Sequence, residues 1–177
     1  MASCDIETWL GKVRVVFEPE PFRVLRIYLP ETYSGDATLT NLSDFAAEFA
    51  NPDSFRQAED FCGMIRQYFN NKKPVDTPWQ WLCLEGLTVP RQKVLKVVSK
   101  IPFGCVRSYG DIAAEAGNPG AARFVGNTMA ANPFPLIIPC HRVIKSNGSI
   151  GGFGGGTDMK SRLLEHEGVL KHSVLAY

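Results

Sequence analysis

Cys140 and His141 are neighbours in the sequence, and a cysteine beside a histidine is a candidate nucleophile with its base. The thiolate is the nucleophilic form of cysteine, and a nearby histidine is one usual means of lowering the thiol pKa. The pair follows the apolar run 136–139 and precedes a glycine-rich loop at 151–156. Cysteine is also a common core residue, and an isolated pair of this kind is more often packing than chemistry. Other positions must decide between these two interpretations.

The composition is that of an ordinary globular chain. Its 177 residues are 45% hydrophobic, which is ample for one large domain or two small ones. No apolar run approaches the ~20 residues that cross a bilayer, and Asp5 and Glu7 lie where a signal peptide would be basic and then apolar. We therefore expect no membrane partner and a cytoplasmic protein, or a nuclear one if the source is a eukaryote.

The cysteines indicate neither a disulfide framework nor a metal site. They are five, an odd number without close pairing: Cys4, Cys62, Cys83, Cys105 and Cys140. There is no C-x-x-C, and all three histidines lie at or after position 141. We expect free thiols, no bound metal and no cofactor.

Charge divides the chain into two halves. Residues 1–85 hold 8 Lys and Arg against 13 Asp and Glu, while residues 86–177 hold 11 against 5. A basic half in a nearly neutral chain indicates a nucleic-acid-binding domain joined to a non-binding one, although drift of surface charge would explain it equally well. The strongest linker signal, at 70–78, leads us to predict an N-terminal domain at 1–85 and a C-terminal domain at 86–177.

The first domain is predicted to be a small antiparallel sheet with a helix. β-branched and aromatic residues at 13–17 and 22–29 predict two strands around a proline-rich break. Apolar residues at helical spacing predict a helix over 54–69, and residues 79–87 are predicted to form one more strand.

The second domain is predicted to be mostly helical. We predict helices over 90–101, 108–116 and 121–131, and a last helix that Thr157-Asp158 caps and that runs through His166. The tight turn at 117–120 makes the second and third of these a helix-turn-helix candidate. The third helix is rich in small residues, with Arg123 as its charge and Asn127 as its candidate for base reading, which favours sequence-tolerant binding.

Several motifs lie within positions 89–168: Val106-Arg107-Ser108-Tyr109, Gly117-Asn118-Pro119, Ala122-Arg123-Phe124-Val125-Gly126, Asn132-Pro133-Phe134-Pro135, Ile138-Pro139-Cys140-His141-Arg142-Val143, the loop 151–156 and Leu164-Glu165-His166-Glu167-Gly168. In order and spacing they resemble those of the O6-alkylguanine-DNA alkyltransferases, the methylated-DNA–protein-cysteine methyltransferase family. The resemblance implies an α+β fold with an RNase H-like N-terminal support domain, and a C-terminal DNA-binding and alkyl-acceptor domain with a helix-turn-helix and an active-site loop.

The resemblance implies direct reversal of DNA alkylation. The alkyl group on O6 of guanine, and by extension on O4 of thymine, moves irreversibly to Cys140, so the protein acts once. By similarity His141 takes the thiol proton through a water, Glu167 orients His141, Tyr109 donates to N3 of the departing purine, and Asn132 orders the active-site turn. Without the family, Glu167 is better interpreted as a solvated helix-end acid and Tyr109 as a core aromatic.

The resemblance also implies how DNA is held. The partner is double-stranded DNA containing O6-alkylguanine, bound by a monomer through the minor groove, with the damaged nucleotide flipped out and Arg123 filling the gap. The DNA-contacting residues are then Arg123, Ala122, Gly126, Asn127 and Arg107. The substrate pocket is assigned to Pro135, Val143, Phe153, Gly154 and Gly155.

The chain departs from some family members at two places. It has Phe153-Gly154 where some relatives have Tyr-Ser, so backbone N–H groups of the loop must replace those hydroxyls. Its N-terminal half has no histidine, so the structural zinc of some relatives is not expected. Cys140 separates it from alkyltransferase-like proteins that lack the cysteine and only mark damage. The alternatives are a non-catalytic lesion sensor or helix-turn-helix regulator and, last, a Cys-His hydrolase.

Overall fold

The computed structural model describes residues 1–33, 40–41 and 52–169. Its contacts divide the chain into two compact units, Met1–Cys83 and the part from Leu84 on. The elements are mixed α and β, with a small antiparallel sheet, which confirms the coarse fold class that the sequence predicts. In the described part of the chain, no helix is long and apolar enough to cross a membrane.

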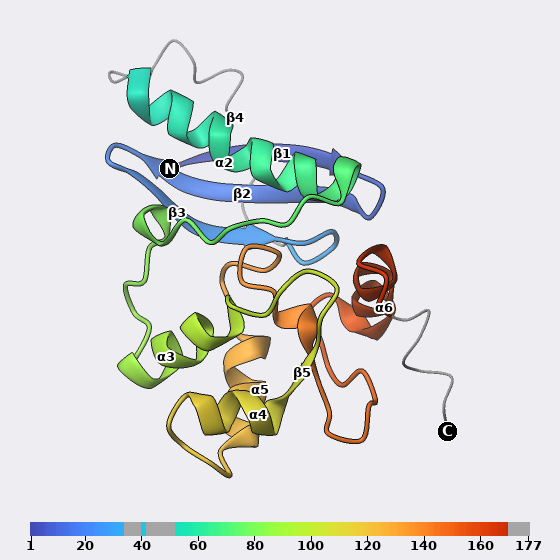
Figure 1. The fold of residues 1–177 in the computed structure, drawn as a ribbon. Helices are drawn as coiled ribbons and strands as arrows, with labels where there is room; N and C mark the ends of the chain where they lie inside the picture. Colours follow the sequence, from blue (N-terminus) through green and yellow to red (C-terminus); the bar gives the residue numbers. More distant parts are fainter. Residues whose placement is uncertain (34–39, 42–51, 170–177) are drawn as a thin grey trace. The chain divides into compact units, whose positions relative to one another are not determined.

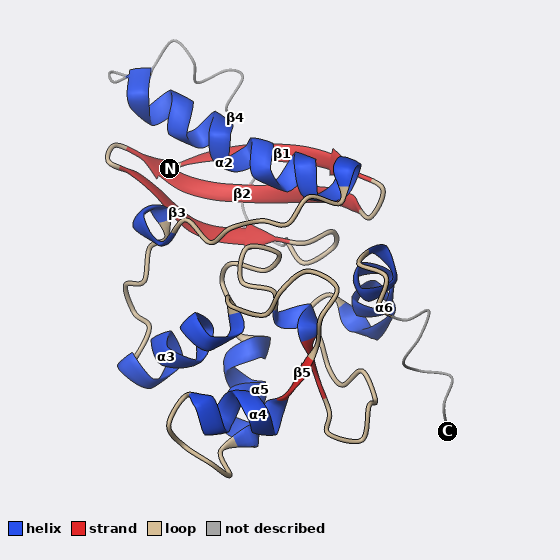
Figure 2. Cartoon of the chain, in the orientation of Figure 1, coloured by secondary structure: helices blue, strands red, loops and turns tan. Residues whose placement is uncertain are grey.

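The first unit is a sheet covered by one long helix (Figures 1 and 2). The sheet has the strand order β3-β2-β1-β4, in which β1, β2 and β3 are antiparallel and β4 is parallel to β1. Inward-facing residues of β2 such as Val13, Val15 and Phe17 are buried, as the period of two predicts. The elements are β1 (Ala2–Thr8), β2 (Gly11–Pro19), β3 (Phe22–Tyr28), β4 (Thr40–Asn41) and α2 (Pro52–Asn71).

Two features of this unit differ from the predictions. β1 was not predicted from the sequence, and its inward residues include the small Ala2 and Cys4. The strand predicted over 79–87 is wrong, because Trp79–Trp81 forms a 3₁₀ helix and only Leu82 makes a bridge, to Val24. The aromatic residues of this segment serve packing, since the Trp81 ring lies 5.8 Å from that of Phe22.

The second unit is mostly helical, with one short parallel strand pair. β5 pairs with β6 so that Arg107 lies opposite Val143. Ser108 begins α4 with a capping box, in which its hydroxyl accepts from the Asp111 N–H and the Asp111 carboxylate accepts from the Ser108 N–H. The elements are α3 (Val89–Val98), β5 (Arg107–Ser108), α4 (Tyr109–Glu115), α5 (Ala122–Ala130), a 3₁₀ helix (Cys140–Arg142), β6 (Val143–Ile144) and α6 (Gly156–His166).

The start of α6 differs from the prediction that Thr157-Asp158 caps it. The helix begins at Gly156 after Gly155, and no side chain makes a capping hydrogen bond. The glycines allow the chain to enter the helix directly from the loop, since Gly156 itself has φ of +86°. Asp158 therefore lies inside the first turn, where its charge complements the positive end of the helix.

Candidate active site

Cys140 begins the 3₁₀ helix that follows a tightly held turn at 132–139. The Asn132 side chain spans this turn, because its Nδ2 donates to the Ile138 carbonyl over 2.9 Å and its Oδ1 accepts from the Phe134 N–H over 3.0 Å. Within the turn Leu136 is buried and has φ of +73°, a conformation unfavourable for a residue with a Cβ. The fold thus fixes the backbone in front of Cys140 at a cost in local strain.

Cys140 is 5% exposed, and its surroundings act on the pKa of its thiol in opposite directions. Burial raises the pKa, whereas a hydrogen bond from Asn132 and the positive charge of Lys160 lower it less strongly. The net effect is a raised pKa, so the resting cysteine is a thiol rather than a thiolate. A base must therefore take its proton when it reacts.

His141 is suited to be that base. Burial lowers the pKa of His141, and the neighbouring Glu167 offsets only part of this effect, so the ring is neutral at pH 7. Its Nε2 lies 2.8 Å from Oε1 of Glu167. Since an ionised carboxylate only accepts hydrogen bonds, Nε2 carries the proton and Nδ1 is the basic nitrogen.

Glu167 is ionised, and its carboxylate accepts four hydrogen bonds. Its Oε1 faces His141 Nε2 and accepts from Arg142 Nη2 over 2.9 Å, while its Oε2 accepts from Arg142 Nε over 2.8 Å and from the Gly104 N–H over 3.1 Å. Burial alone would raise the pKa of Glu167, but the hydrogen bonds from His141 and Arg142, together with the charge of Arg142, outweigh it and bring the pKa to about 2.

The end of α6 places Glu167 in this position. Gly168 follows with φ of +80°, its N–H donates to the Glu165 carbonyl, and the Val169 N–H donates to the Leu164 carbonyl. This pair of bonds is a Schellman motif, which ends the helix with the chain turned back. The motif reverses the chain immediately after Glu167, whose carboxylate contacts His141, Arg142 and Gly104.

Arg142 is a member of this site that the sequence analysis missed. It is 5% exposed, makes the two bonds to Glu167 described above, and donates from Nη1 to the Ile101 carbonyl over 2.7 Å. Its position directly after His141 gave no sign of a partner 25 residues away. A fully paired arginine holds the carboxylate in one orientation because its planar donors fit it in two places.

A cavity of about 390 Å³ opens beside Cys140. Of the predicted pocket residues, Phe153 and Gly154 line it, whereas Pro135, Val143 and Gly155 are not among its lining residues. The full lining is Tyr109, Gly126, Met129, Ala130, Cys140, Gly152, Phe153 and Gly154. The cavity therefore joins the cysteine, the predicted proton donor Tyr109 and the predicted DNA-contacting residue Gly126.

Lys160 is the second residue that the sequence analysis missed. It is fully buried and donates from Nζ to the carbonyls of Val143, over 2.6 Å, and Gly152, over 3.3 Å. Burial lowers its pKa to about 8, and the nearby Cys140 opposes this shift. The available signal was helical periodicity, since Lys160, Leu164 and Glu167 follow one face of the chain at helical spacing and Leu163 beside them is also buried.

The residues predicted to contact DNA lie mainly along α5. Arg123 and Asn127 are exposed, and Ala122 and Gly126 are half-buried. Positions 123, 126 and 130 share one face of a helix, and the last two line the Cys140 cavity. Arg107 lies apart from this face at β5, where its guanidinium forms an ion pair with Glu115.

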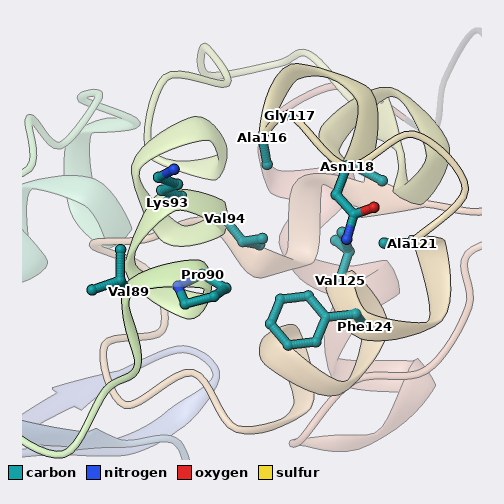
Figure 3. Close-up of a pocket in the computed structure, with 11 residues that line it drawn as sticks. Val89, Pro90, Lys93, Val94, Ala116, Gly117, Asn118, Ala121, Phe124 and Val125 are labelled. Atoms are coloured by element: carbon teal, nitrogen blue, oxygen red, sulfur yellow. The ribbon is translucent and has the colours of Figure 1, made fainter.

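A second hollow, of about 240 Å³, lies between the start of α3 and the turn that joins α4 to α5 (Figure 3). Phe124 faces it from α5 and Pro90 from α3. Phe124 is 36% exposed, so α5 presents a large aromatic side chain as well as small residues at its surface. The residues lining the hollow do not include Cys140.

Comparison with known proteins shows related chains. A family profile described as "6-O-methylguanine DNA methyltransferase, DNA binding domain" matches residues 90–169. A methylated-DNA–protein-cysteine methyltransferase of Methanothermobacter thermautotrophicus is 48% identical over 95 residues, 54% of this chain and 53% of that protein. The human protein of that name is 51% identical over 78 residues, 44% of this chain and 38% of that protein. The chain's match thus spans about half, or less, of these relatives.

Solved structures extend the similarity over most of the chain. The crystal structure of Mycobacterium tuberculosis O6-methylguanine methyltransferase has a TM-score of 0.72 and 32% identity, covering 94% of this chain and 92% of that one. A methyltransferase structure from Methanococcus jannaschii has a TM-score of 0.59 and 28% identity, covering 94% and 93%. The likeness therefore includes both units.

Proposed function

Because this chain belongs to the O6-methylguanine DNA methyltransferase family, we propose that it transfers an alkyl group from O6 of guanine in DNA to Sγ of Cys140. The observation that carries this proposal is the arrangement of Cys140 at a cavity, with a neutral His141 held by a fully bonded Glu167. O4-alkylthymine presents the same kind of alkyl–oxygen bond and is proposed as a second substrate.

The reaction is a displacement at a saturated carbon. The thiol proton moves through a water to Nδ1 of His141, Sγ attacks the alkyl carbon, and the bond from that carbon to O6 breaks with its electron pair going to the guanine. Glu167 stabilises the imidazolium that forms, and Arg142 keeps the carboxylate in place. The product is a thioether, which water does not cleave at an appreciable rate, so each protein molecule acts once.

Tyr109 is proposed to protonate the departing guanine at N3. Burial and the nearness of Cys140 both raise the pKa of Tyr109, so its hydroxyl keeps the proton until it is needed. The glycine at position 151 brings the loop against the ring, because a Cβ there would lie 3.2 Å from the Tyr109 hydroxyl. A loop residue with a side chain would displace the donor.

We assign DNA binding to α4 and α5 as a helix-turn-helix, with α5 in the minor groove. A duplex hides O6 within the base stack, so the nucleotide must be flipped out. Arg123 is exposed on the face of α5 that also lines the cavity, which suits it to fill the vacated space. The N-terminal unit is proposed to be an RNase H-like support, the protein to act as a monomer, and its place to be with the DNA in the cytoplasm or nucleus.

Transfer is tested with a duplex carrying one O6-methylguanine. After incubation and trypsin digestion, the peptide 124–142 should carry one methyl group on Cys140, at no more than one equivalent per protein. Cys140→Ser should abolish transfer, while the matched control Cys105→Ser, at an exposed cysteine, should retain it. Repeated turnover, or methylation elsewhere, would contradict the proposal. Undiminished damage recognition without any transfer by the native chain would support the sensor alternative.

A further inference from the structure

Two buried cysteines of the N-terminal unit contact each other far from Cys140 in the sequence. Cys4 on β1 is 3% exposed, Cys62 on α2 is 1% exposed, and their thiols are hydrogen bonded. Arg66 lies one helical turn after Cys62, and its Nη2 donates to Cys4 Sγ over 3.8 Å. Arg66 is itself exposed, so the Cys4 sulfur lies immediately below the surface.

The pair is chemically asymmetric. The hydrogen bond from Cys62, together with the charge of Arg66, lowers the pKa of Cys4 even though burial opposes the shift. The same hydrogen bond and burial raise the pKa of Cys62. The Arg66 guanidinium lies against the Cys4 sulfur and stabilises its thiolate, which suits Cys4 to react first and Cys62 to resolve the product.

We propose that Cys4 and Cys62 form a hydroperoxide-responsive dithiol that closes to a reversible disulfide while Cys140 remains a thiol. In the first step the Cys4 thiolate attacks the terminal oxygen of the hydroperoxide and the O–O bond breaks, so that the OH group stays on sulfur. The alkoxide or hydroxide that leaves takes up, through solvent, the proton that Cys4 released on ionising, and departs as alcohol or water. Cys4 becomes a sulfenic acid. Cys62 sulfur then attacks Cys4 sulfur and displaces hydroxide, which takes the Cys62 proton and leaves as water. The hydroperoxide is reduced by two electrons and the two thiols are oxidised.

The geometry suits bond formation. Thiols already in hydrogen-bond contact need a short approach to reach the S–S length of about 2.05 Å. The bond would join β1 to α2, which are packed against each other within the same unit. By contrast, burial raises the pKa of Cys140, so the alkyl acceptor reacts slowly with peroxide. The N-terminal pair would therefore be oxidised while the acceptor stays usable.

The test treats the reduced full chain with hydrogen peroxide, blocks remaining thiols with N-ethylmaleimide, and digests with trypsin. Peptide 1–12 should appear linked to peptide 57–66, the link should vanish on treatment with a reducing phosphine, and Cys140 should carry the blocking group. A link that involves Cys83 or Cys105 in place of this pair, or oxidation of Cys140 before Cys4, would overturn the proposal.

Two variants test the roles of the pair. Arg66→Gln changes an exposed side chain and should slow oxidation of Cys4 by roughly fivefold or more, because less thiolate is present. Arg56→Gln, at an exposed arginine of the same helix, is the matched control and should not slow it. Cys62→Ser should stop the reaction at a Cys4 sulfenic acid, which dimedone traps. Equal rates in the two arginine variants would refute the inference even if Cys62→Ser failed to fold.

Discussion

Replacement of Glu167 by glutamine should destabilise the C-terminal unit by several kcal/mol. The carboxylate accepts four hydrogen bonds, and a glutamine must direct its NH₂ group toward donors of His141, Arg142 or Gly104. Arg142, 5% exposed, would then keep a buried charge without its partner. Removing one member of a buried ion pair typically costs about 3–5 kcal/mol.

The pKa of Glu167 gives a second route to this magnitude. Its pKa is about 2, against an ordinary value of 4.5. At ~1.4 kcal/mol for each pH unit, this lowering corresponds to ~3 kcal/mol of stability. Because the folded pKa is the lower one, this contribution is fully present above about pH 5 and is lost as the pH falls toward 2. The two routes agree on a cost of about 3 kcal/mol.

Urea unfolding measured from pH 7 to pH 3 checks this prediction. Native protein should lose stability as the pH falls, and Glu167→Gln should start ~3 kcal/mol lower with a shallower slope. Glu165→Gln makes the same chemical change at an exposed position of the same helix, and should lie within about 0.5 kcal/mol of native. A Glu167→Gln protein with native stability and native pH slope would refute the reasoning.

Three further outcomes are expected. The native protein should gain up to ~3 kcal/mol of unfolding free energy between pH 8 and 10.5, because the folded pKa of Lys160, about 8, lies below its ordinary 10.5. Lys160→Met should remove this rise. Equal pH slopes for the two proteins would contradict the prediction. Tyr109→Phe should slow single-turnover transfer by ~10²-fold without a comparable loss of stability, and an unchanged rate would exclude proton donation by Tyr109. Alkylation of Cys140 should lower the melting temperature and weaken DNA binding, because the added group crowds a residue that is only 5% exposed. A melting temperature unchanged by alkylation would count against this prediction.

Local sequence patterns predicted the helices and strands better than they predicted the long-range contacts of the site. Helical periodicity placed α2 and α3 close to their observed bounds, and cap and turn signals did the same for α4 and α5. The strand expected at 79–87 failed because tryptophans favour strands in general, whereas here Trp81 packs on Phe22 from a 3₁₀ helix. In such short apolar stretches tertiary packing decides the local structure.

The candidate site shows the same contrast between local patterns and long-range contacts. Cys140 and His141 are adjacent, so the sequence pairs them directly, but Glu167 was assigned only through the family resemblance. Arg142 and Lys160 were missed because a charged residue is usually exposed, and only the fold shows that each is buried against carbonyl and carboxylate oxygens. The roles of all these residues in transfer stay predictions until transfer is measured.

The raised pKa of Cys140 is compatible with a protein that reacts once. A permanently ionised thiolate would be exposed to oxidants and other electrophiles, whereas a buried thiol becomes reactive only when its proton is removed. His141 is neutral and held by Glu167, so the base is ready before the substrate arrives. The rigid ion pair of Arg142 with Glu167 prevents that base from turning away. In the proposed reaction, these buried charges reserve the thiol for an alkylated nucleobase that reaches the cavity, and removing the same charges should cost the unit its stability.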